Sequence, residues 1–218
     1  MLAPYGVSFL PGTAAKNAAE AVAVAAQIGY PVVLKILSAG IAHKTEVGGV
    51  RLNIADPAQL QLACDAMLAS VQQHAPQARI DGFLVQPMAS GGVAELIAGV
   101  THDAVFGPSL TVGLGGVLTE IYQDASHRLL PVDEGMVREM LHELKAWPLL
   151  DGFRGRPKAD VDACCATVAA LSHAQQSLGD RVSDIEINPI QVRAQGQGAW
   201  GLDALVLFHT QTTPGDSA

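Results

Sequence analysis

A histidine, a lysine and two glycines lie close together in the segment YPVVLKILSAGIAHKTEVGGVRLNI. His43 lies in the polar stretch between two apolar runs, and Lys35 lies inside the first of those runs. An imidazole nitrogen can accept a phosphoryl group and pass it on. Gly48 and Gly49, which follow the histidine, either form a tight turn or let backbone N–H groups approach a phosphate. A solvated surface histidine is the alternative to a phosphate carrier.

Lys35 lies on the same face of the expected strand as Val33 and Leu37, because successive strand side chains alternate between faces. A buried ammonium group without a partner costs several kcal/mol, so this side chain either extends to water or meets an anion. Extension to water is the commoner outcome for lysines, and a bound phosphate is the alternative. The segment therefore contains residues that could form a phosphate site, but each of them also has an ordinary structural explanation.

A second group of polar side chains lies in VSDIEINPIQV, near the C-terminus. Ile185 and Ile187 point to one face of the expected strand, whereas Asp184, Glu186 and Asn188 point to the other. The run WGLDALVLF follows after the turn-forming residues AQGQGA. We therefore expect these two runs to form a hairpin.

A hairpin that is symmetric about Gln195–Gly196 places Asn188 directly opposite Asp203, with Cβ atoms about 5 Å apart. Together with Glu186, these oxygens suit Mg²⁺, which binds one or two carboxylates plus waters and phosphate oxygens at about 2.0–2.1 Å. The alternative is a solvated strand face with a turn-forming Asn-Pro. Pro189 interrupts the ladder, and a register slip of one residue would separate the pair.

Hydrophobic periodicity and capping residues predict an α+β chain of short helices and strands. The expected helices are 13–29 with Thr13 as its cap, 56–75 with Asp56 as N-cap and Pro57 at its first position, 133–144 and 160–178. The expected strands are 31–37, 50–54, 82–88, 94–100, 109–117, 182–192 and 200–208. We expect a smaller lobe over 1–89, a larger lobe over 90–209 and a disordered tail at 210–218.

Composition restricts the class of protein. The chain has 218 residues and a formal net charge of −8, which argues against nucleic acid as a partner because such binding needs clustered cations. Apolar runs stay well short of the roughly 20 residues of a membrane span, and the N-terminus lacks the basic region of a signal peptide. The 3 cysteines show no metal-binding spacing and suit a reducing compartment. The sequence therefore predicts a soluble, cytoplasmic protein.

These segments together resemble a known family. YPVVLKILSAGIAHKTEVGGVRLNI, DIEINPI and GLDALV are similar to the ATP-grasp domain of NDP-forming acyl-CoA synthetases, which include the ADP-forming acetyl-CoA synthetases and are akin to the β subunit of succinyl-CoA synthetase. The resemblance runs from about Tyr5 to Phe208. It implies an ATP-grasp fold, in which two α+β lobes enclose a nucleotide cleft. It also implies a ligase that forms acid–thiol bonds, exchanging acyl-CoA, ADP and phosphate with acid, CoA and ATP.

The resemblance implies a role for each candidate residue. In this family an acyl phosphate forms and a histidine of a partner CoA-ligase domain takes the phosphate. Some members relay it through a second histidine on a mobile loop, and His43 matches that histidine. Lys35 matches the nucleotide-phosphate lysine, and Asn188 and Asp203 match the ligands of Mg²⁺. Glu186 matches a glutamate that steadies the phosphohistidine. Taken together, these matches imply Mg²⁺ as cofactor and ATP or ADP as substrate.

Further nucleotide contacts follow from the same resemblance. Glu95 matches an acidic residue of the nucleotide pocket, and Gly48–Gly49 would offer amides to phosphate. The expected strand 82–88 matches the family's hinge strand but departs from its pattern after Gln86. There Pro87 replaces a glutamate and offers neither a carboxylate nor an N–H. Met88 would then have to supply the amide contact to adenine.

The loop that carries His43 has the length to move a phosphate between two sites. From Ser38 to Glu46 it spans up to about 30 Å when extended, so its tip can move on the order of 10 Å with both ends anchored. We therefore expect His43 to be the carrier.

The sequence holds neither a CoA-binding domain nor the domain of the acyl-phosphate histidine, so we expect a CoA-ligase domain or α subunit as partner. The chain would then be a β subunit of a hetero-oligomer or a fragment of a fused chain. Two other functions are compatible with the sequence. A non-catalytic nucleotide-sensing module of a larger acyl-CoA-related protein is favoured by Pro87. An ATP-grasp carboxylate–amine ligase would need no loop histidine.

Overall fold

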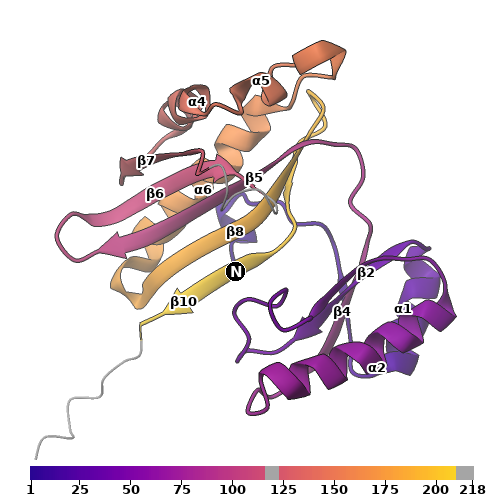
Figure 1. The fold of residues 1–218 in the computed structure, drawn as a ribbon. Coiled ribbons are helices and arrows are strands. Elements are labelled where there is room, and N and C mark those ends of the chain that lie inside the picture. Colours follow the sequence, from indigo (N-terminus) through magenta and orange to yellow (C-terminus); the bar gives the residue numbers. More distant parts are fainter. Residues whose placement is uncertain (116–122, 210–218) are drawn as a thin grey trace, which may run out of the picture. The chain divides into compact units, whose positions relative to one another are not determined.

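The computed structural model describes residues 1–115 and 123–209. The chain divides into two compact units. The smaller unit is Leu10–Ser90, and the larger unit combines Met1–Phe9 with Gly91–Ala218. Each unit has its own hydrophobic core and its own antiparallel sheet (Figure 1). The α+β class expected from the sequence is confirmed.

The N-terminal segment Met1–Phe9 belongs to the larger unit, whereas the sequence-based division placed it in the smaller lobe. Leu2 and Val7 are buried in the core of the larger unit, and the N–H of Gly201 donates to the carbonyl of Ser8 at 2.8 Å. These contacts join residues far apart in the sequence, so local patterns did not reveal them. The predicted tail and the end of the predicted strand 109–117 lie outside the described residues.

The smaller unit is a four-stranded sheet with two helices on one face (Figure 1). The strands, in the spatial order β1-β4-β2-β3, are β1 (Thr13–Ala15), β4 (Gly82–Pro87), β2 (Val32–Leu37) and β3 (Val50–Ile54). The helices are α1 (Ala18–Ile28) and α2 (Pro57–His74). Leu34 and Ile36 of β2 are fully buried against Leu60 and Met67 of α2 in one core. Because strand side chains alternate, Lys35 lies on the face away from these helices.

Capping side chains explain where these helices begin. The Asp56 carboxylate accepts from the N–H of Gln59 at 2.8 Å and Pro57 opens α2, which confirms the predicted start. The predicted cap of the first helix is wrong. Thr13 lies in β1 opposite Val85, and Asn17 caps α1 by accepting from the N–H of Glu20 at 2.9 Å.

The larger unit has a six-stranded sheet. Its strands are β10 (Ala204–Phe208), β8 (Val182–Arg193), β5 (Gly92–Asp103), β6 (Gly107–Leu114) and β7 (Ala125–Leu129) in spatial order, with β9 (Ala199–Gly201) paired to β8. The helices are α4 (Glu134–Glu143), α5 (Trp147–Leu150) and α6 (Val161–Leu178), with short 3₁₀ turns at Ala3–Tyr5, Phe153–Gly155 and Gly179–Arg181. Among residues 1–115 and 123–209, no helix combines the length and apolar character that crossing a membrane requires.

Helices α4 and α6 pack on one face of the larger sheet (Figure 1). Ile185 and Ile187 of β8 point into this core and are 1% and 0% exposed. The opposite side, which we call the polar face, carries residues that alternate with the core residues: Glu95, Gly99, Thr111, Asp184, Glu186, Asn188 and Gln191. The candidate metal ligand Asn188 and the candidate acidic residues Glu95 and Glu186 therefore lie on the side of the sheet that these two helices leave uncovered.

Asp160 joins the start of α6 to the turn between β8 and β9. Its carboxylate accepts from the N–H of Ala163 at 3.2 Å and from the N–H of Gly198 at 2.8 Å, and its own N–H donates to the carbonyl of Arg193 at 2.8 Å. One buried side chain therefore caps the helix and holds the hairpin turn.

We expect Asp160→Ala to lower the free energy of unfolding by about 2 kcal/mol, because it removes an N-cap and leaves a second N–H without its acceptor. Urea denaturation followed by circular dichroism measures this change. Asp162→Ala is the matched control: its carboxylate is 85% exposed and pairs with Arg138 at the surface, so the loss stays below about 1 kcal/mol. Equal losses in the two variants would contradict the double role of Asp160.

Candidate functional site

The C-terminal hairpin has the predicted register. Ile187 lies opposite Ala204 and Ile190 lies opposite Gly201. Between these pairs the N–H of Asn188 donates to the carbonyl of Asp203 at 3.1 Å. The two candidate metal ligands are therefore cross-strand neighbours, as a hairpin symmetric about Gln195–Gly196 requires.

The returning strand differs from the prediction in its continuity. The expected single strand 200–208 is interrupted between β9 and β10. There the N–H of Leu202 donates to the carbonyl of Pro189 at 2.9 Å, so the register continues across the interruption. Pro189 has no N–H to return that bond, which explains why the ladder breaks opposite it.

The donor atoms on this hairpin fit a magnesium ion that also binds phosphate. Asn188 is exposed and Asp203 is half-buried, with one carboxylate oxygen accepting from the N–H of Ala204 at 3.0 Å. Within the described part of the chain, no group of three or more His, Cys, Asp or Glu residues is placed to hold a metal. A hard cation at Asn188 and Asp203 would therefore complete its shell with waters and phosphate oxygens, which is the usual arrangement for Mg²⁺.

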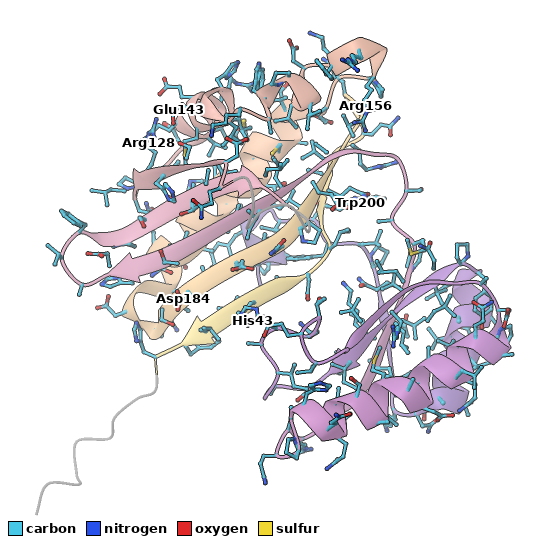
Figure 2. All side chains as sticks on the ribbon, viewed as in Figure 1. His43, Arg128, Glu143, Arg156, Asp184 and Trp200 are labelled. Carbon is cyan, nitrogen blue, oxygen red and sulfur yellow. The ribbon has the colours of Figure 1, made fainter. Side chains whose placement is uncertain are left out.

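Glu186 belongs to a row that crosses the polar face. Gly99 of β5 lies opposite Glu186, Thr111 of β6 lies opposite Gly99, and His127 of β7 lies opposite Thr111. The Thr111 hydroxyl and Nδ1 of His127 are 2.8 Å apart, a hydrogen bond that fixes the orientation of the ring. Sequence analysis did not find this threonine–histidine pair, because only the order of the strands brings β6 and β7 together. Asp184 lies one row further along β8 (Figure 2).

Lys35 lies in β2, an inner strand of the smaller sheet, opposite Leu84 of β4 and Val50 of β3. It is 8% exposed. Most of the side chain is therefore covered, and its contact with nucleotide phosphate stays a prediction. Its side chain leaves the strand on the face away from the helices.

The two glycines after His43 close a tight turn. The N–H of Gly49 donates to the carbonyl of Lys44 at 2.7 Å, and the N–H of Gly48 donates to the carbonyl of Thr45 at 3.1 Å. This pair of bonds is a Schellman motif, with Gly48 in the left-handed conformation at φ 69°. Both N–H groups are thus used within the loop, so the structure has the turn, and a phosphate contact would require these bonds to open.

His43 is exposed on the loop between β2 and β3 (Figure 2). Ile41, two positions earlier, is 6% exposed and belongs to the core of the smaller unit. The loop is therefore anchored on both sides of the histidine, by Ile41 before it and by the Lys44–Gly49 turn after it. The ring itself is not packed into the core, as a phosphate carrier requires.

The hinge strand uses several of its polar groups internally. The side-chain amide of Gln86 donates to the carbonyl of Leu10 at 2.8 Å. The N–H of Met88 donates to the carbonyl of Pro31 at 3.3 Å, and the Met88 sulfur accepts from the N–H of Asn53 at 3.4 Å. A contact from the Met88 amide to adenine, as expected from the sequence, would therefore compete with an existing hydrogen bond.

Comparison with known proteins identifies the fold. The family model described as an ATP-grasp domain matches residues 1–207. The chain belongs to the ATP-grasp family. The recognition made from the lysine, loop and hairpin motifs is confirmed, and so is the ATP-grasp fold.

The relatives narrow the branch of the family. The β subunit of acetate–CoA ligase (ADP-forming) II from Pyrococcus furiosus is 36% identical over 95% of this chain and 88% of that protein. Acetate–CoA ligase (ADP-forming) I from Archaeoglobus fulgidus is 39% identical over 90% of this chain but only 28% of its own length. The chain thus spans less than a third of the length of this relative. It corresponds to the ATP-grasp, nucleotide-binding part of ADP-forming acyl-CoA synthetases.

Solved structures agree with this assignment. A crystal structure from Pyrococcus horikoshii Ot3 has a TM-score of 0.88 with 36% identity, over 95% of this chain and 87% of that one. An acetyl-coenzyme A synthetase 1 from Ca. Korarchaeum cryptofilum, in complex with coenzyme A and Ca-AMPCP, has a TM-score of 0.85 with 34% identity, over 95% of this chain and 89% of that one.

We expect Gly48→Ala to lower the free energy of unfolding by about 1–2 kcal/mol, because a Cβ is disfavoured in the left-handed region. The added Cβ would also lie 2.6 Å from the hydroxyl oxygen of Ser70. Urea denaturation measures the loss, and hydrogen exchange at the N–H of Gly49 should become faster. Gly40→Ala is the control in the same loop, since its Cβ would meet its nearest neighbours at 3.8 Å. A Gly48→Ala variant as stable as Gly40→Ala would contradict the turn.

Proposed function

We propose that the chain is the nucleotide-handling half of an ADP-forming acyl-CoA synthetase. The observation that carries this proposal is an exposed histidine, His43, on an anchored loop of an ATP-grasp domain with this ancestry. A 32% identical relative was solved with a phosphorylated phosphohistidine segment, and a 30% identical structure has that segment pointing towards the nucleotide site. By analogy, the phosphoryl group of an acyl phosphate passes through the partner's histidine to His43 and then to ADP, and the reverse reaction starts from ATP.

The remaining candidate residues supply positioning and charge neutralisation, which phosphoryl transfer demands more than covalent chemistry. Lys35 would contact the nucleotide phosphates, and Asn188 and Asp203 would hold a Mg²⁺ ion, which would neutralise phosphate charge. Glu186 would accept a hydrogen bond from the phosphohistidine ring. Bound Mg²⁺ supplies the charge that lets the carboxylates of the polar face share a site with polyphosphate.

A companion polypeptide completes the reaction in this proposal. One relative is named as a β subunit, and a second relative carries this region in a chain more than three times as long. The chain would accordingly work with a CoA-ligase domain, as a separate α subunit or as part of a fused protein, in the cytoplasm.

A second candidate is a nucleotide-sensing module without catalysis. Pro87 ends the hinge strand β4 and has no N–H, and the next N–H, of Met88, is already used. Fewer hinge donors would weaken or alter nucleotide binding without affecting the fold. The two candidates differ in whether bound ATP phosphorylates the protein.

We expect the purified chain, incubated with MgATP, to gain one acid-labile, alkali-stable phosphate on His43. Mass spectrometry under neutral conditions locates the phosphate. His43→Ala should abolish the label and leave the Kd for ATP unchanged, because the ring transfers phosphate and does not hold the nucleotide. His102→Ala, which changes another exposed histidine, should keep the full label. Labelling that persists in His43→Ala would assign the carrier elsewhere, and ATP binding without any label would favour the sensor.

We expect Asp203→Asn to weaken MgADP binding about tenfold, a loss of about 1.4 kcal/mol, because a carboxylate ligand of the ion becomes a neutral amide. Isothermal titration calorimetry measures the Kd with Mg²⁺ and again with EDTA, where the substitution should no longer weaken binding. Asp180→Asn, at an exposed position in a 3₁₀ turn, is the control for net charge. An Asp203→Asn variant with unchanged MgADP affinity would remove this residue from the metal site.

A further inference from the structure

Gln191 of β8 carries a buried polar atom that the fold does not explain. The residue is 7% exposed, and its side-chain oxygen Oε1 has no hydrogen-bond partner within residues 1–115 and 123–209. A buried acceptor left unpaired costs about 1–3 kcal/mol. Such an atom in a native protein calls for a bound water, an ion or a ligand.

The neighbours of Gln191 on the polar face have the chemistry of a nucleoside site. Glu95 of β5 lies opposite Gln191 on one side, and Trp200 of β9 lies opposite it on the other. Trp200 is labelled in Figure 2. Glu95 is exposed and Trp200 is half-buried. The guanidinium carbon of Arg193 lies 4.4 Å from the centre of the Trp200 ring. The row therefore presents an aromatic ring, an amide oxygen and a carboxylate in order across the sheet.

Gly92 allows the Gln191 side chain to take this position. A Cβ at residue 92 would lie 2.8 Å from Cγ, Cδ and Nε2 of Gln191. The glutamine amide therefore lies against the backbone at the start of β5, in space that only a glycine leaves free. A side chain at residue 92 would displace it.

The position of Gln191 along β8 suits the sugar of a nucleotide. Gln191 follows Asn188 by three positions, and a β-bulge between them brings the two residues closer than the roughly 10 Å that three residues span in a regular strand. That separation is comparable with the length of the phosphate chain of a nucleotide whose terminal phosphates share a metal ion with Asn188. Cross-strand neighbours have Cβ atoms about 5 Å apart, so Glu95 and Gln191 bring two acceptor-bearing side chains to the same part of the polar face. Phosphate oxygens offer no donor to two acceptors, whereas the adjacent 2′ and 3′ hydroxyls of ribose offer two.

We propose that Gln191 is a specificity-determining residue that accepts a hydrogen bond from a ribose hydroxyl of the nucleotide, beside Glu95. The inference rests on the proposed nucleotide binding and adds a residue to it that sequence motifs did not indicate. With this contact the chain would bind ribonucleotides more tightly than deoxyribonucleotides, because the ribose hydroxyl would donate to Oε1 of Gln191, which otherwise has no partner among the described residues.

Binding of MgATP, Mg-2′-deoxy-ATP and Mg-3′-deoxy-ATP to the full chain, measured by calorimetry, tests this proposal. Gln191→Met keeps the length of the side chain and removes the oxygen. We expect it to weaken ATP about tenfold, equivalent to about 1.4 kcal/mol, and to leave unchanged the Kd of the analogue that lacks the bonded hydroxyl. Gly92→Ala should give the same pattern by displacing the amide. Gln72→Met, at an exposed position of α2, should change none of the three affinities.

The outcomes separate the inference from the proposed function. Equal weakening of ATP and both deoxy analogues in Gln191→Met would assign the amide to the base or to structure and overturn the ribose contact. Unchanged ATP affinity in both Gln191→Met and Gly92→Ala would overturn it as well. In each of these cases ATP still binds the wild-type chain, so the proposed function stands. A wild-type chain that binds none of the three nucleotides would overturn both.

Discussion

The backbone hydrogen bond from Asn188 to Asp203 fixes the feature on which the candidate site depends, the register of the C-terminal hairpin. A slip of one residue in a strand moves every side chain to the other face of the sheet. In the observed register Ile187 fills the core while Glu186 and Asn188 face away from the helices. Asp160 stabilises this register from outside the hairpin, because its carboxylate accepts a hydrogen bond from the N–H of Gly198 in the turn. The chemistry of the hairpin is thus set by backbone pairing and by one buried carboxylate.

The sequence predicted this hairpin well because the information is local: alternation, a glycine-containing turn and a symmetric pairing. Helix caps such as Asp56 were equally readable. The failures concern partners distant in the sequence. Thr13 was assigned to a helix because its pairing with Val85 lies about seventy residues away. The availability of the amides at Gly48 and Met88 was also not readable, since a motif shows that an N–H exists and does not show which carbonyl already accepts it.

The loop around His43 combines exposure with anchoring, and the two have different consequences for a carrier. The exposed ring is not packed into the core, but a movement on the order of 10 Å requires more of the loop to leave its place. Withdrawing Ile41 from the core would cost about 1.5–3 kcal/mol, the value of burying one such side chain. That cost is small enough for a bound nucleotide or partner to offset and large enough to keep the loop in place without them.

The charge of the polar face decides how a nucleotide can bind there. Asp184, Glu186 and Asp203 bring carboxylates to neighbouring positions of β8 and the adjoining strand segment, in a chain whose net charge is −8. Polyphosphate would be repelled by these groups unless a divalent cation lay between them, so nucleotide and metal must bind as one species. The same reasoning explains why a neutral amide is useful at Gln191. An uncharged acceptor can pair with a sugar hydroxyl without adding to the repulsion that the metal ion must already overcome.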